Sequence, residues 1–352
     1  MRALLSAALP LVLSGSRASP HPVPDLSRLP AARVVAHPER SEILIDLAPV
    51  DLPAGLAHEG GHAHGAQPPV ALAVLPVGGA LYGFRAEAID SLGRPLPAAL
   101  IHHVNVIDPE NRELFLPISR RLLAAGRETG SLALPWLFFG VPLERGQRLV
   151  VSAVLHNPLG ADFYGVRVRV VLRYTPEGRP WPVFRGAPFQ LDVAFPVGDK
   201  SFDLPPGRTV RTYEASPAVP GTIVAIGGHL HDYGVSIEFR NATTGEVVWR
   251  AEPVRDSAGR LASIPVGRLY GLTRLGVRVL PSERYRVTVV YDNPTGRTLP
   301  AGGMGVVGGL FVPDDGVSWP RVDRADSLYW RDLAHYTRGL VAPQLTAVAH
   351  AH

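Results

Sequence analysis

Residues 222–240 read TIVAIGGHLHDYGVSIEFR and contain two strand-like segments joined by a short turn. The first segment is apolar and the second alternates apolar with polar side chains, as β-strands do. His229 and His231 lie where the first segment ends, separated by one residue. Because residues i and i+2 of a strand project from the same face, both imidazoles can approach one cation. The segment therefore predicts a β-rich fold with a candidate metal-binding pair.

This pair does not select one metal. Neutral imidazole binds copper, zinc, iron and nickel, so the ligand type leaves the ion open. An isolated His-x-His is about as often a surface or hydrogen-bonded pair of histidines as a metal site. Features elsewhere in the chain must decide between these interpretations.

The composition favours an all-β chain and excludes some classes of site. The 352 residues include 36 glycines and 35 prolines, which are spread along the sequence and divide it into many short segments. Cysteine is absent, so disulfides and thiolate metal sites are excluded. The net charge is +4, but arginines alternate with apolar residues, as in residues 166–170. They are expected on the solvent face of strands, and no nucleic-acid partner is predicted.

The N-terminus has the features of a secretory signal. An arginine and a short apolar run precede small residues near Ala18, so residues 1–18 are predicted to be cleaved on export. The apolar run is too short to span a bilayer, and no integral membrane segment is expected after cleavage. The mature protein is expected to be secreted or periplasmic.

The rest of the chain is predicted to form two domains. Residues 19–68 are expected to form an extended N-terminal arm that includes a histidine-rich loop with His58, His62 and His64. Strand-like segments follow, and a polar, turn-rich stretch divides them into a first domain over 69–195 and a second over 196–315. Residues 316–352 contain apolar side chains at helical spacing, which predict a C-terminal helix.

Two further patterns bear on these domains. Residues 150–160 (VVSAVLHNPLG) parallel residues 287–296 (VTVVYDNPTG), since each is a strand that ends in Asn-Pro-x-Gly. This internal similarity favours two related domains. Residues 117–126 interrupt the strand pattern and are expected to form a helical turn or two.

A second histidine pair occurs in the first half. His102 and His103 are adjacent, so in a regular strand one would be buried and the other exposed. They can share one metal only if a bulge turns one of them. His156 ends another predicted strand and would have to lie beside them.

Four segments of the chain occur in an order known from one protein family. They are residues 101–106 (IHHVNV), 154–158 (VLHNP), 228–234 (GHLHDYG) and 302–306 (GGMGV). Over roughly residues 70–315, the chain resembles the copper type II, ascorbate-dependent monooxygenases, the group of dopamine β-monooxygenase and peptidylglycine α-hydroxylating monooxygenase. The resemblance implies two jelly-roll β-sandwich domains in tandem, each with one copper, followed here by a short C-terminal helix.

The resemblance also assigns metal ligands. His102 and His103 match the histidine pair of the electron-transfer copper, and His229 and His231 match the pair of the copper that activates dioxygen. His156 is the candidate third ligand of the first copper.

Two of the family's ligand positions hold other residues here. The position aligned with the third ligand of the first copper is Val154, which shares a strand face with His156. For the second copper, the aligned methionine position is Leu310, and Met304 is the candidate instead. An arginine that precedes His-x-His in the peptide-hydroxylating branch is replaced by Gly227, which argues against a glycine-extended peptide as substrate.

The resemblance implies a secreted copper-dependent monooxygenase-like protein that hydroxylates a C–H bond of a small molecule, with O2 and ascorbate or another reductant. The alternative is a non-catalytic metal-binding or interaction protein that keeps the double sandwich with incomplete copper sites. A third interpretation is a glycan amidase of the peptide:N-glycosidase F type. That class uses acidic residues, and no specific carboxylate arrangement favours it.

Overall fold

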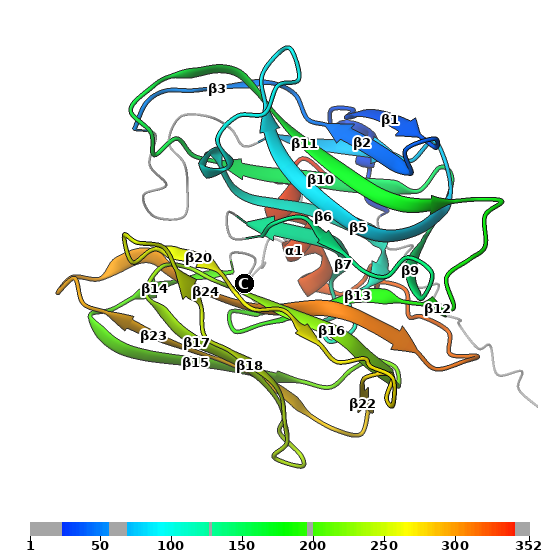
Figure 1. Cartoon of the computed structure of the whole chain (residues 1–352). Coiled ribbons are helices and arrows are strands. Elements are labelled where there is room, and N and C mark those ends of the chain that lie inside the picture. The colour runs from blue at the N-terminus through cyan, green and yellow to red at the C-terminus, as the bar shows by residue number, and fades with distance from the viewer. Residues whose placement is uncertain (1–22, 56–68, 127–128, 196–199, 342–352) are drawn as a thin grey trace, which may run out of the picture.

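The computed structural model describes residues 23–55, 69–126, 129–195 and 200–341. These residues form two jelly-roll β-sandwiches in tandem, with an α-helix near the C-terminal end (Figure 1). The predicted all-β class is confirmed. The predicted signal, residues 1–18, and the histidine-rich loop with His58, His62 and His64 lie outside the described residues.

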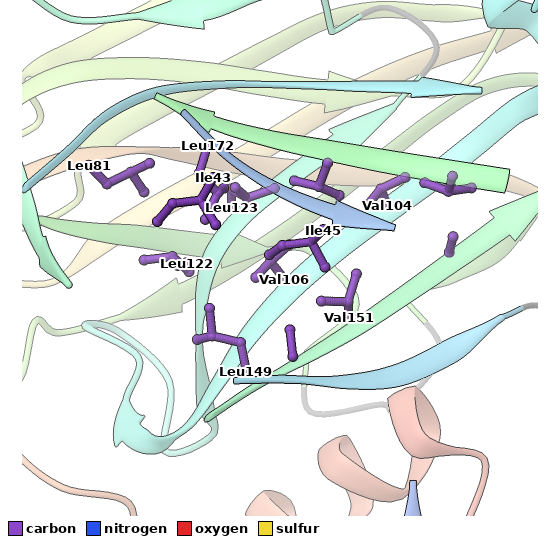
Figure 2. Close-up of a cluster of buried hydrophobic side chains, with 14 of the residues drawn as sticks. Ile43, Ile45, Leu81, Val104, Val106, Leu122, Leu123, Leu149, Val151 and Leu172 are labelled. Carbon is purple, nitrogen blue, oxygen red and sulfur yellow. The ribbon is translucent and has the colours of Figure 1, made fainter. Parts of the chain in front are cut away.

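The first sandwich contains two sheets. One runs β1 (Arg33–His37), β2 (Glu42–Asp46), β11 (Phe163–Pro176), β5 (Gly79–Ile89), β9 (Phe139–Leu143) and β12 (Phe184–Arg185), with β3 (Val50–Leu52) beside β11 and β8 (Leu132–Ala133) beside β5. The other runs β4 (Val70–Val74), β10 (Arg148–Leu155), β6 (Ile101–Arg112) and β7 (Ser119–Gly126). A short 3-10 helix, η2 (Ala98–Leu100), leads into β6. Alternate residues of both sheets form the core, as Figure 2 shows for Ile43, Ile45, Val104 and Val106.

The second sandwich is built in the same way. One sheet runs β13 (Ala187–Asp192), β24 (Leu299–Pro313), β16 (Gly221–Leu230) and β21 (Gly267–Arg268), with β14 (Ser201–Leu204) beside β24 and β22 (Val277–Val279) beside β16. The other runs β15 (Gly207–Ala215), β23 (Tyr285–Asn293), β17 (Gly234–Asn241) and β18 (Val247–Ala251). A separate ribbon joins β19 (Val254–Arg255) and β20 (Leu261–Ser263).

The two sandwiches repeat one connectivity. Strands β2, β11, β5 and β9 correspond in order to β13, β24, β16 and β21, and the second sheets correspond likewise. Asn157 and Asn293 follow the equivalent strands β10 and β23. Each amide donates to the carbonyl four residues later and accepts the N–H two residues later. Each also donates to the carbonyl that ends β3 or β14, Leu52 or Leu204. The sequence similarity therefore reflects a shared set of hydrogen bonds, in which the asparagine side chain joins the turn after its strand to the end of β3 or β14.

The domain boundary differs from the predicted one. β13 precedes residue 195, yet it pairs with β24 of the second sandwich along its whole length. The second domain therefore begins at Ala187, directly after β12 of the first sandwich. The N-terminal region also differs, because β1, β2 and β3 within residues 19–68 join the first sandwich. Burial of Ile43 and Ile45 explains why this segment pairs with β11 and does not extend into solvent.

Residues 117–126 form a strand, not the predicted helical turns. β7 (Ser119–Gly126) pairs with β6 from His103 to Arg112, and Leu122, Leu123 and Ala125 are buried. Its two arginines are also buried. Arg120 donates to Asp108 at 2.7 Å, and Arg121 binds Asp332. Tertiary partners for these charges override the local pattern.

The α-helix α1 (Ser327–Thr337) packs between the two sandwiches (Figure 1). Asp326 caps its N-terminus by accepting the Leu328 N–H. Tyr329 and Leu333 are fully buried in an apolar cluster that also includes residues of β6, β10 and the short 3-10 helix η1 (Leu26–Arg28). Within the described part of the chain, no helix is long and apolar enough to cross a membrane.

The loop between β6 and β7 belongs to the core of the other domain. Leu114, Phe115, Leu116 and Ile118 are all at most 3% exposed and lie in the hydrophobic cluster of the second sandwich. The Phe115 ring lies 5.8 to 5.9 Å from three aromatic rings of that core, between centroids. This inserted loop fixes the first sandwich against the second.

Buried charges hold the base of the inserted loop. Glu113 is fully buried and accepts the backbone N–H groups of Leu114, Arg121 and Gln190, the last from β13. Arg121 forms a two-pronged ion pair with Asp332 of α1, at 2.6 Å for both contacts. Because each partner is 3% exposed, breaking this pair would leave an uncompensated buried charge.

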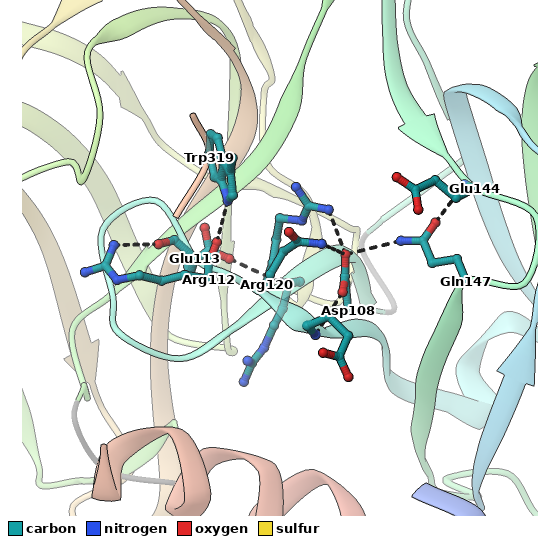
Figure 3. A network of polar contacts seen from close by, with 10 residues as sticks. Asp108, Arg112, Glu113, Arg120, Glu144, Gln147 and Trp319 are labelled. Carbon is teal, nitrogen blue, oxygen red and sulfur yellow. Dashed lines mark hydrogen bonds and ion pairs between the residues drawn. The ribbon is translucent and has the colours of Figure 1, made fainter. Parts of the chain in front are cut away.

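A second polar network surrounds Asp108 on the other side of the loop (Figure 3). The Asp108 carboxylate accepts from Arg120 and from the Gln147 amide. The Trp319 indole donates to the carbonyl of Arg112 and ties the segment before α1 to the loop. Together, the two networks join both domains and the helix.

Replacing Phe115 with alanine should lower the free energy of unfolding by about 3–5 kcal/mol, because it opens a cavity where the domains share a core. Urea unfolding followed by tryptophan fluorescence measures this loss. Phe138→Ala is the matched control, since that side chain is 52% exposed, and it should change stability by under about 0.5 kcal/mol. Equal effects of the two variants would contradict the role of the inserted loop.

Stability should fall as the pH rises through the range set by Glu113. Burial raises the pKa of Glu113 from 4.5 to about 7. Between these values the unfolded chain has released the proton and the folded chain has not, so the free energy of unfolding decreases with pH and then levels off. The decrease from this group should be on the order of a few kcal/mol. Urea unfolding across the window measures it.

Glu113→Gln is the control for this effect, because its amide cannot titrate. The variant should be less stable at low pH, since its NH2 group faces a backbone donor, but its stability should vary less with pH. An unchanged pH slope in the variant would assign the effect to another carboxyl group.

Candidate metal centre

His229 and His231 lie on the face of the second sandwich that meets the first. Along β16, Ile226 and Leu230 point into the second core, whereas Ala225 belongs to the first core. His229 and His231 alternate with Leu230 and therefore share the face of Ala225. As predicted from the i, i+2 spacing, both imidazoles project from one face of the strand.

A tight turn follows this pair. The Gly234 N–H donates to the His231 carbonyl, and Tyr233 adopts a left-handed backbone with φ of 69°. The Asp232 carboxylate accepts the Leu261 N–H at 2.8 Å, which anchors the turn to β20. The chain therefore reverses directly after His231 and keeps the imidazole at the end of the strand.

The bulge required at His102 is present. His103 of β6 lies opposite Val154 of β10, and Ile101 lies opposite Leu155, so His102 is the extra residue. The consequence appears in the core, where Ile101 and Val104 are both buried although three positions separate them. The bulge thus turns both His102 and His103 away from the first core.

His156 reaches the same place from the neighbouring strand. Leu155 of β10 faces the first core, so Val154 and His156 face outward. The His156 N–H donates to the Leu100 carbonyl, directly before β6. The ring centroids of His156 and His102 are 5.3 Å apart.

All five histidines form one cluster between the domains. We call the set His102, His103, His156, His229 and His231 the five-histidine cluster. The His103 and His229 rings hydrogen-bond through their Nε2 atoms at 3.0 Å, although 126 residues separate them. The His231 ring lies 5.5 Å from His102 and 5.7 Å from His103, between centroids. The resemblance implies two separate sites, one per domain, but the structure brings both sets together.

The geometry of the cluster fits a metal ion. One ring nitrogen each of His102, His103 and His231 lies within 4.8 Å of the others. In a tetrahedral site with metal–nitrogen bonds of about 2 Å, two ligand nitrogens lie about 3.3 Å apart. Binding therefore requires the nitrogens to approach one another by up to about 1.5 Å. All five residues are half-buried, and the Nε2 atoms of His102, His156 and His231 are buried, so the centre of the cluster is shielded from solvent.

The register of β24 against β16 places Met304 next to the cluster. His229 pairs with Val306 on β24, so Met304, two residues before Val306, is on the same strand face and half-buried. Leu310, at the family's methionine position, is buried against the first core. Val154, at the family's third-ligand position, lies opposite His103.

The same bulge occurs in the second sandwich without ligands. β17 and β23 shift register between Gly234 and Ser236, so Val235 occupies the place of His102. Asp292 stands before Asn293 as His156 stands before Asn157. The bulge is thus a property of the repeated fold, whereas the positions of His102, His103 and His156 hold other residue types in the second sandwich.

Sequence reasoning missed one residue next to the cluster. The Tyr291 hydroxyl accepts the His231 backbone N–H at 2.9 Å, yet Tyr291 belongs to the opposite sheet of its sandwich. Its one sequence signal was the similarity between residues 150–160 and 287–296, which aligns Tyr291 with Leu155 beside His156.

No protein-family model and no curated protein matches this chain. It is similar to the solved structure of infectious bursal disease virus Gx strain, with 11% identity and a TM-score of 0.24 over 83% of this chain and 73% of that one. The mavirus major capsid protein has 9% identity and a TM-score of 0.24 over 89% and 93% of the chains. PNGF-II has 10% identity and a TM-score of 0.31 over 78% and 66%. At these TM-scores, the similarities carry no argument about function.

Proposed function

We propose that this chain is an exported metalloprotein whose copper centre is built from both domains. The observation that supports this most directly is the convergence of His102, His103 and His231 from two sandwiches onto one point. Histidines that served only as surface groups would have no reason to meet across a domain boundary. A shared ion gives such a reason, because it joins imidazole nitrogens that otherwise compete for protons.

Copper is the metal that we propose first. The ligands are imidazoles without thiolates, and among the divalent first-row ions such sites bind copper most tightly. Zinc is the alternative that a binding experiment must test. The hydrogen bond between His103 and His229 places a fourth imidazole close to the three that converge.

The second candidate function is a copper-dependent monooxygenase activity. The set of three converging imidazoles favours it, since three protein ligands leave a coordination position for another molecule. When bound, copper would supply electron exchange between O2 and a reductant such as ascorbate. The residues of the chain would hold the imidazoles and shield them on the side of the two cores, and a small molecule would be the substrate.

The single cluster, together with Val154 and Leu310 at aligned ligand positions, favours binding over catalysis. Two separated centres would be needed for the electron transfer that the resemblance implies. We therefore place metal binding first and oxygen chemistry second.

Titration of the purified protein with Cu(II) and Zn(II), followed by metal analysis after dialysis, tests the binding function. We expect about one copper ion per chain, held more tightly than zinc. Replacing His102, His103 and His231 together with alanine should abolish this binding. His37→Ala should not, because His37 lies on β1 and pairs with Glu39. Equal copper content in all three proteins would refute the proposed site, and two ions per chain would favour separate centres.

Oxygen chemistry has a separate readout. If the monooxygenase proposal is right, copper-loaded protein reduced with ascorbate should consume O2 on exposure to air and regain its Cu(II) electron paramagnetic resonance signal. The triple-alanine variant with equal free copper is the control for background oxidation. A reduced protein that stays unchanged in air would leave metal binding as the function.

A further inference from the structure

We infer that Tyr291 is a positioning residue that sets where the His231 imidazole enters the five-histidine cluster. This inference rests on the proposed metal-binding function and names a residue that acts on the centre through His231. Tyr291 is fully buried and extends from β23 across the second sandwich. Its hydroxyl therefore reaches the sheet that carries the histidines from the opposite layer.

The hydroxyl occupies the place where two strands separate. β16 pairs with β24 as far as Leu230 and Gly305, and the next pair would be His231 with Met304. That pair does not form. Instead, the Tyr291 hydroxyl accepts N–H groups from His231 at 2.9 Å and from Met304 at 3.1 Å, and it donates to the Met304 carbonyl.

This arrangement separates His231 from β24 without leaving backbone groups unsatisfied. If the hydroxyl were missing, the two strands would have to close on each other or keep buried polar groups without partners. Either outcome moves the backbone of His231 relative to His229, whose place in the ladder opposite Val306 stays fixed. A shift on the scale of one bond length is enough to spoil a metal ligand set.

Packing alone does not require a tyrosine at this position. The equivalent residue of the first sandwich is Leu155, which fills its core with an apolar side chain and is 5% exposed. β5, the strand of the first sandwich that corresponds to β16, does not end in a His-x-His turn. The hydroxyl at residue 291 therefore stabilises the turn that carries His231, which the first sandwich does not have.

Tyr291→Phe tests the inference, with Tyr285→Phe as the matched control. Both tyrosines lie on β23, both are fully buried and both hydroxyls are hydrogen-bonded, but the Tyr285 hydroxyl binds Glu283 at the other end of the strand. Both variants should therefore lose a similar amount of thermal stability. Only Tyr291→Phe should weaken Cu(II) binding, by about 10- to 100-fold, and change the copper hyperfine splitting.

The outcomes separate this inference from the function on which it rests. Wild-type protein that binds no copper refutes the proposed function. Wild-type binding with the same affinity and spectrum in Tyr291→Phe overturns the positioning role, as does equal weakening in both variants. If Tyr291→Phe does not fold, 3-fluorotyrosine at position 291, which keeps the hydroxyl but makes it a weaker acceptor for the His231 N–H, is compared with wild type. Its copper hyperfine splitting should shift, and an unchanged spectrum and affinity would overturn the inference.

Discussion

Insertion of the β6–β7 loop into the second core is the constraint on which the candidate centre depends. Phe115 and its neighbours are buried among residues of the other sandwich, so the two domains cannot rotate freely against each other. Glu113 and Arg121 extend this contact to β13 and α1. The five-histidine cluster draws ligands from both sides of this contact, and its geometry is therefore set by hydrophobic burial far from the histidines.

Most of the fold follows from local patterns. Alternating strands, frequent glycine and proline, and one helical period near the C-terminus were enough to predict a double sandwich with a helix. The repeated Asn-Pro-x-Gly ending correctly indicated related domains. Residues 117–126 were predicted wrongly, because their local sequence does not show that Arg120 and Arg121 have buried partners in Asp108 and Asp332.

The candidate site was predictable within each strand and not between domains. The i, i+2 rule placed His229 and His231 on one face, and the chemistry of adjacent residues required a bulge at His102. His103 and His229 are 126 residues apart in the sequence, and their contact depends on how the two sandwiches pack against each other. No periodicity in the sequence encodes that stacking. It is set by the inserted loop, whose burial in the other domain only the structure shows.

The same backbone bulge occurs in both sandwiches, but its extra residue is a histidine only in the first. In the first domain its extra residue is His102, and in the second it is Val235, which is 39% exposed. The irregularity is therefore present whether or not histidines stand on it. The second sandwich has the same backbone frame on β17 and β23, so substitutions to histidine at Val235, Ser236 and Asp292 would place three imidazoles as His102, His103 and His156 are placed.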